Sequence, residues 1–237
     1  MNKNICFPKS SFTVKQLLFV ILFLESLAIT IAITKAITLG ISPKTFFGEV
    51  NRGGFITYIS GLQLLIAAVL SKMISKIVKS AQQLSNSRWF WLIIFWGLLF
   101  LTLDDLIGIH ESLDYWLHNL FQFKETKLSD LADDLIVGGY LVIFLIYVAF
   151  QWQIIKGFRQ SFIWFKLGFI LTAVMVVLDM ASNNTLFVSM MTDDVDLASA
   201  IQQWLGVIED SAKIYAEGMF IVGIYKCWQI AKISRNN

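Results

Sequence analysis

Long apolar stretches, separated by short polar segments, alternate along the chain of 237 residues. Several of them exceed the roughly 18 consecutive apolar residues that indicate a transmembrane helix. The pattern predicts six membrane-spanning helices, at about 16–40, 54–77, 89–109, 135–155, 162–190 and 197–230. We therefore expect an all-α, polytopic membrane protein with a single transmembrane domain, residues 1–237.

The composition supports a membrane protein and argues against a nucleic-acid partner. Apolar residues make up 57% of the chain and charged residues 15%, whereas soluble domains have about 25% charged residues. The net charge is only +2, and no basic cluster is interleaved with aromatic residues, as a nucleic-acid interface would require. The lipid bilayer is thus the expected partner and the cell (inner) membrane the expected location, while the sequence does not indicate an oligomeric state.

The basic residues predict the orientation of the helices in the membrane. If the N-terminus is cytoplasmic, the cytoplasmic segments contain thirteen lysines and arginines and the outer loops contain four. The thirteen are Lys3, Lys9, Lys15, Lys72, Lys76, Lys79, Arg88, Lys156, Arg159, Lys166, Lys226, Lys232 and Arg235. The four are Lys44, Arg52, Lys124 and Lys127. Because positive charge favours the cytoplasmic side, we expect both termini to be cytoplasmic.

The acidic residues follow the opposite distribution. None of the 17 aspartates and glutamates falls in a predicted cytoplasmic segment. Asp104 and Asp105 end the third predicted helix on its outer side, Asp179 lies in the outer half of the fifth, and Glu209 and Asp210 lie about halfway along the sixth. Charged groups at this depth need water or protein partners, so we expect a buried polar site that opens to the outer side.

The sixth predicted helix carries the clearest candidate site. Glu209, Lys213 and Glu217 recur at i, i+4 and i+8, and Asp210 precedes Lys213 by three residues, so all four share one stripe. A charge in hydrocarbon costs about 2.5–3.5 kcal/mol. The stripe is therefore either an ion or proton site or a structural ion pair that locks helices together. Three acids to one lysine leave excess negative charge, which favours the first interpretation.

The third predicted helix adds further candidate residues. Asp104 and Glu111 are seven residues apart and share a face, and we expect Gly108 between them to allow close helix packing. His110 lies off that face, where it is either a metal ligand beside Glu111 or a simple hydrogen-bonding group. Metal ligation would make a divalent metal ion the cofactor.

Two segments carry a resemblance to known proteins. Asp104-Asp105-x4-His110-Glu111 and Glu209-Asp210-Ser211-x-Lys213 resemble a pattern of uncharacterised bacterial multi-span membrane proteins. In these proteins an acidic pair precedes His-Glu, and a late helix begins with two acids. The resemblance covers the third and sixth predicted helices and implies no activity.

The second segment is also similar to the first motif of glutamate-type intramembrane proteases, a Glu-Glu pair followed by Lys or Arg. In that family the first acid, here Glu209, activates water for peptide hydrolysis. This chain has Asp210 at the second position and places the motif on its last predicted helix, with no histidine-bearing helix after it.

Three functions are compatible with these residues. The leading hypothesis is cation or proton binding and transport by the acids and the lysine of the predicted site. These residues are Asp104, Asp105, Glu111, Asp179, Glu209, Asp210, Lys213 and Glu217. The alternative is an intramembrane, metal- or glutamate-dependent hydrolase of a lipid or peptide, with Glu209, Asp210 and His110 as catalytic residues and His110 and Glu111 as metal ligands. The third is a membrane assembly factor.

Overall fold

A computed structural model describes residues 12–48, 54–80, 87–109, 112–113, 116, 130–183, 192 and 194–236. Its elements, in order, are α1 (Val14–Leu39), the 3-10 helix η1 (Pro43–Phe46), α2 (Phe55–Ser80), α3 (Arg88–Ile107), α5 (Asp130–Phe150), α6 (Trp152–Lys156), the 3-10 helix η4 (Arg159–Ser161), α7 (Phe162–Asn183) and α9 (Val195–Asn236). No strand occurs in these ranges. The prediction of an all-α protein is confirmed.

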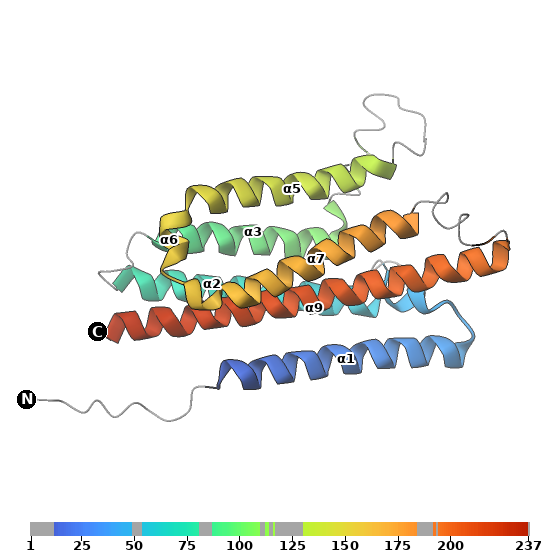
Figure 1. Ribbon diagram of the computed structural model, residues 1–237, viewed down its shortest axis with the longest axis horizontal. Coiled ribbons are helices and arrows are strands. Elements are labelled where there is room, and N and C mark those ends of the chain that lie inside the picture. The colour runs from blue at the N-terminus through green and yellow to red at the C-terminus, as the bar shows by residue number, and fades with distance from the viewer. Residues whose placement is uncertain are drawn as a thin grey trace, which may run out of the picture.

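The long helices lie alongside one another, with α9 between α1 and α7 and with α5 on the outside next to α3 (Figure 1). Among the described helices, four are long and apolar enough to cross a membrane. They are α1, α2, α3 and the segment Arg159–Ser182, which contains most of α7. The chain is therefore a multi-pass membrane protein by length and composition, and the number six remains a prediction.

Two predicted spans end differently in the structure. The span at 135–155 is not one helix, because α5 ends at Phe150 and α6 begins at Trp152. Between them, the backbone N–H of Gln151 donates to the carbonyls of Tyr147 and Val148. The last helix is longer than the predicted 197–230, since α9 has 42 residues and is about 63 Å long at 1.5 Å per residue.

Gly108 has a role that was not predicted. It adopts φ 63° and caps the end of α3, with its amide donating to the carbonyl of Asp104 at 2.8 Å. A left-handed residue of this kind ends a helix, and glycine adopts it without steric cost. The structure thus shows Gly108 as a helix end, its expected part in close helix packing stays a prediction, and α3 stops at Ile107 instead of reaching 109.

α9 is the central helix of the bundle. It packs against α1, α2, α7, η1 and η4, and two apolar clusters line its length. One cluster, which includes Ile74, Trp91 and Ile221, lies toward the end where α1 begins and α9 ends. The other includes Ala28 and Ile214. The second cluster overlaps the polar part of α9, since Ile214 lies between Lys213 and Glu217, and the first cluster lies beyond this part toward Asn236.

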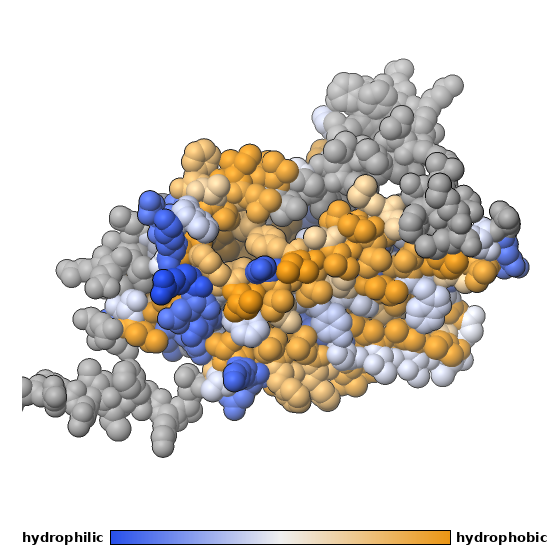
Figure 2. All heavy atoms as spheres, in the orientation of Figure 1, coloured by the Kyte–Doolittle hydropathy of each residue, from blue (hydrophilic) through white to orange (hydrophobic). Residues whose placement is uncertain are grey.

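α1 shows how the outer helices divide between lipid and protein. Its buried residues are spaced three and four apart on one face of the helix: Glu25, Ala28, Ala32 and Ala36. Its exposed residues include Phe19, Phe23, Leu24, Leu27 and Ile31. Figure 2 shows an apolar middle, with hydrophilic side chains gathered at the end where α1 begins and α9 ends. This distribution is that of a bundle whose middle faces lipid.

Glycines allow α7 and α9 to approach each other closely. The ring of Phe220 on α9 lies against Gly168 of α7, and the ring of Phe165 on α7 lies against Gly223 of α9. A Cβ on Gly168 would be 2.7 Å from the Phe220 ring, and one on Gly223 would be 3.1 Å from the Phe165 ring. Small residues at helix interfaces serve this purpose in membrane proteins.

Replacing Gly168 with alanine should lower the free energy of unfolding in detergent by about 1–3 kcal/mol, because the new methyl group overpacks the contact with Phe220. The matched control is Gly97→Ala on α3, where a Cβ meets nothing within 4 Å, so the helix preference of alanine should leave stability equal or slightly higher. Thermal unfolding followed by circular dichroism measures both. Equal melting temperatures for the two variants would contradict the close packing of α7 on α9.

Candidate functional site

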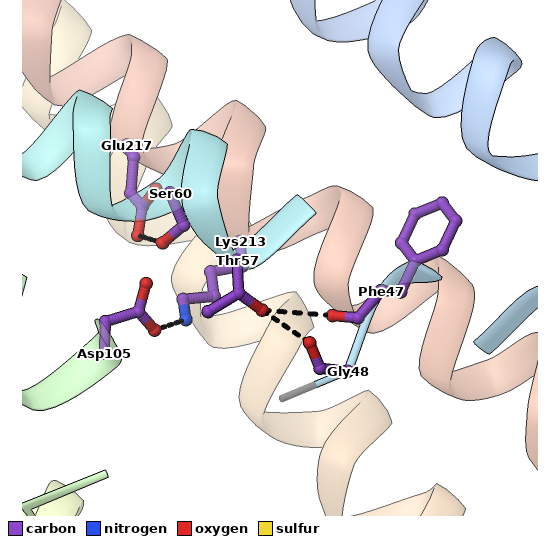
Figure 3. A network of polar contacts seen from close by, with 7 residues as sticks. All are labelled: Phe47, Gly48, Thr57, Ser60, Asp105, Lys213 and Glu217. Carbon is purple, nitrogen blue, oxygen red and sulfur yellow. Dashed lines mark hydrogen bonds and ion pairs between the residues drawn. The ribbon is translucent and has the colours of Figure 1, made fainter. Parts of the chain in front are cut away.

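The charged stripe of α9 contacts several neighbouring helices. Lys213 forms an ion pair with Asp105, near the end of α3. One turn further along α9, Glu217 accepts a hydrogen bond at Oε1 from the hydroxyl of Ser60 on α2, at 2.8 Å. Figure 3 shows both contacts between α9 and its neighbours. The ion pair brings two of the expected site residues, one on α3 and one on α9, into direct contact.

The same stripe also contacts α7. The hydroxyl of Ser182 lies 3.3 Å from Oε2 of Glu209, and Gln202, two turns before Glu209, donates its amide to the carbonyl of Ser182 at 2.8 Å. Asp179, one turn before Ser182, is half-buried and interacts electrostatically with Glu209. Glu209, Lys213 and Glu217 therefore contact α7, α3 and α2 respectively.

These residues form one electrostatic network, which we call the α9 network. It consists of the carboxyl groups of Asp105, Asp179, Glu209, Asp210 and Glu217 and the ammonium groups of Lys44 and Lys213. The side chains are largely removed from solvent: Asp105 is 13% exposed, Lys213 31% and Glu217 8%. Five carboxyl groups and two ammonium groups make the network strongly acidic.

Two carboxyl oxygens of the network lack hydrogen-bond partners. Oδ2 of Asp105 and Oε2 of Glu217 are buried, and neither has a partner among the described residues. Buried polar atoms are normally bonded, and a buried carboxylate oxygen without a donor is costly. Each oxygen is free to accept a hydrogen bond or to ligate a cation.

Lys44 is a member of the network that the sequence analysis placed only in an outer loop. It belongs to η1, and its side chain lies across Gly206 of α9, where a Cβ would be 2.8 Å from Nζ. The loop is fixed to α2 because the Thr57 hydroxyl donates to the carbonyl of Gly48 at 2.7 Å (Figure 3). Lys44 thereby reaches Glu209 and Asp210 electrostatically, which no spacing in the sequence indicates.

Glu25 of α1 is a second residue that the site prediction omitted. Its carboxyl oxygen Oε1 accepts a hydrogen bond from the amide of Gln63 on α2, at 2.5 Å, and it interacts electrostatically with Glu217. The signal in the sequence is an acid in the middle of an otherwise apolar span, which is a functional candidate by default.

The remaining predicted residues divide into two groups. Asp104 is buried on α3, at 5% exposure, beside Asp105. His110 and Glu111 lie outside the described residues, so the predicted metal site and the hydrolase that depends on it are not tested. Within the described part of the chain, no three histidine, cysteine, aspartate or glutamate side chains gather closely enough to hold a metal ion.

The fold and this site define a helical, multi-pass membrane protein with an acidic interior. The chain belongs to the family described as a domain of unknown function, DUF8692, which matches residues 16–227. No curated protein and no solved structure matches it. The family is consistent with the expected resemblance to uncharacterised multi-span proteins, and the comparisons show no likeness to a protease.

We expect Asp105→Asn and Lys213→Gln each to destabilise the folded protein by about 1.5–3 kcal/mol, the range for a hydrogen bond to a charged group. The reason is that each single change leaves the other charge without its partner. The double variant should lose less than the sum of the two, because an amide pair replaces the ion pair. Unfolding in detergent measures the cycle, and strictly additive losses would contradict a direct interaction.

Proposed function

We propose that the protein binds a cation or a proton at the α9 network and transfers it across the membrane. The observation that carries this proposal is the charge imbalance of the network, with five carboxyl groups and two ammonium groups. A buried charge without a partner is strongly unfavourable, and protons or bound cations can neutralise the excess negative charge of the described groups.

The unpartnered oxygens favour ion binding over a purely structural role. A structural ion pair requires only matched charges and satisfied hydrogen bonds. Here Asp105 already pairs with Lys213. Even so, Oδ2 of Asp105 and Oε2 of Glu217 have no hydrogen-bond donor among the described residues. Glu217 also interacts electrostatically with both Lys213 and Asp105. These two oxygens are the atoms that would receive the ion or the proton.

Lys213 serves as the internal countercharge in this proposal. It interacts with Asp105, Asp210 and Glu217, which surround it on α3 and α9. A cation that enters the network competes with the ammonium group for the same carboxylates. Lys213 then moves away from Asp105 as the ion binds, and it returns when the ion leaves.

The proposed orientation has six spans and cytoplasmic termini in the cell membrane. Lys79 and Arg235 lie in the last turns of α2 and α9, and these helix ends are at the same end of the bundle as the start of α1 (Figure 1). This arrangement fits the positive-inside rule. Lys44 and Glu209 are then on the outer side, and Glu217 is deeper. The apolar cluster around Ile74, Trp91 and Ile221 separates Glu217 from the cytoplasm. An ion thus enters from the outer side.

Reconstituted Glu217→Gln and Asp105→Asn variants should lose at least 10-fold of the cation or proton flux of the wild type. Each substitution removes a carboxylate that stabilises the bound ion. A loss of about 1.4 kcal/mol or more in this stabilisation corresponds to a 10-fold effect. Flux is measured in liposomes under an imposed membrane potential, with a pH-sensitive dye for protons and a selective dye for Na⁺ or K⁺.

The matched control is Asp196→Asn, which neutralises an exposed acid in the first turn of the same helix and should retain wild-type flux. Folding of every variant is checked by gel filtration before reconstitution. The proposal is wrong if folded wild type moves none of the three ions faster than protein-free vesicles, or if both core variants keep full flux.

A further inference from the structure

Glu25 occupies a buried position on a helix that otherwise faces largely outward. Its side chain is 2% exposed and lies about halfway along α1. The carboxyl group rests on Gly218 of α9, since a Cβ at Gly218 would meet Oε1 and would lie 3.0 Å from Cδ. Gly218 therefore provides the space that the carboxyl group fills, directly beside Glu217.

The hydrogen bonds around Glu25 are incomplete for an ionised carboxylate. The amide nitrogen of Gln63 donates to Oε1 at 2.5 Å. Oε2 of Glu25 and Oε1 of Gln63 are both buried, and neither has a partner in the described structure. A carboxylate and an amide oxygen are both acceptors, so they cannot satisfy each other. A protonated carboxyl group can donate from Oε2 to the amide oxygen and so satisfy both atoms.

The charges around Glu25 favour the same protonation state. α9 presents Glu217, which repels an ionised Glu25, and Tyr215, whose hydroxyl is bonded to the neighbouring Ser26 at 2.8 Å. α2 presents the neutral Gln63. The ammonium group of Lys44 in η1 lies against Gly206, about three turns of α9 from Gly218. In the described part of the chain, no basic side chain forms an ion pair with Glu25.

We propose that Glu25, Gln63 and Gly218 form a proton-binding site inside the membrane. Glu25 carries a proton on Oε2 and donates it in a hydrogen bond to Oε1 of Gln63, while Gln63 donates its amide to Oε1 of Glu25. Gly218 lets the carboxyl group pack against α9. The use of this proton in transport, by exchange with Glu217, rests on the proposed function, whereas the protonation of Glu25 does not.

Infrared spectroscopy of the purified full chain in detergent at neutral pH tests the site. We expect a carbonyl stretch of a protonated carboxylic acid that is lost in Glu25→Gln. This variant should keep wild-type thermal stability, because its amide reproduces the shape and the hydrogen-bonding capacity of the protonated acid. The band should persist in Asp196→Asn, which changes an exposed acid of α9.

A second variant keeps the test decisive if Glu25→Gln does not fold. In Gln63→Leu the carboxyl group loses both hydrogen bonds to the side-chain amide, and its carbonyl stretch should move to higher frequency. The inference is overturned if folded wild type shows no protonated carboxyl band that either substitution alters. Because the spectrum requires no transport, a Glu25 band without ion flux would refute only the proposed function. Flux without the band would refute only the proton site.

Discussion

The partial or complete burial of four charged residues on one helix is the constraint on which this structure depends. Glu209, Asp210, Lys213 and Glu217 cannot face hydrocarbon without a large cost, so α9 must be surrounded by protein over this part of its length. The bundle meets this requirement by packing α1, α2 and α7 around α9, and α3 contributes Asp105 as the partner of Lys213. The more apolar helices can expose large side chains at the periphery, as α1 does.

The α9 network and the Glu25 site meet at two adjacent residues of α9. Glu217 and Gly218 are neighbours on α9: the first bonds to Ser60 of α2, and the second accommodates Glu25 of α1. Glu25 and Glu217 therefore come close enough to repel each other when both are ionised. A proton on either one relieves that repulsion. This coupling connects the acidic α9 network with the proton site proposed on α1.

The sequence predicted the parts of the site that depend on one helix. The spacing of Glu209, Lys213 and Glu217 placed them on one stripe, and the acids of the third, fifth and sixth predicted helices were expected to share one buried polar site. It could not assign partners, because a single acid such as Glu25 has no periodic signal that points to Gln63 or Gly218. The helix-ending role of Gly108 was not predicted for a related reason: it depends on a backbone angle, which is positive here.

Charge displacement on a solid-supported membrane measures whether the α9 network takes up ions from outside the protein. Wild-type proteoliposomes are adsorbed on the sensor and exposed in turn to jumps in H⁺, Na⁺ and K⁺ concentration. If the network binds ions, at least one of these jumps gives a transient current, which also reports binding without complete transport. The current should be much smaller after Glu217→Gln. Folded wild-type protein that gives no current with any of the three ions would contradict ion uptake by the network.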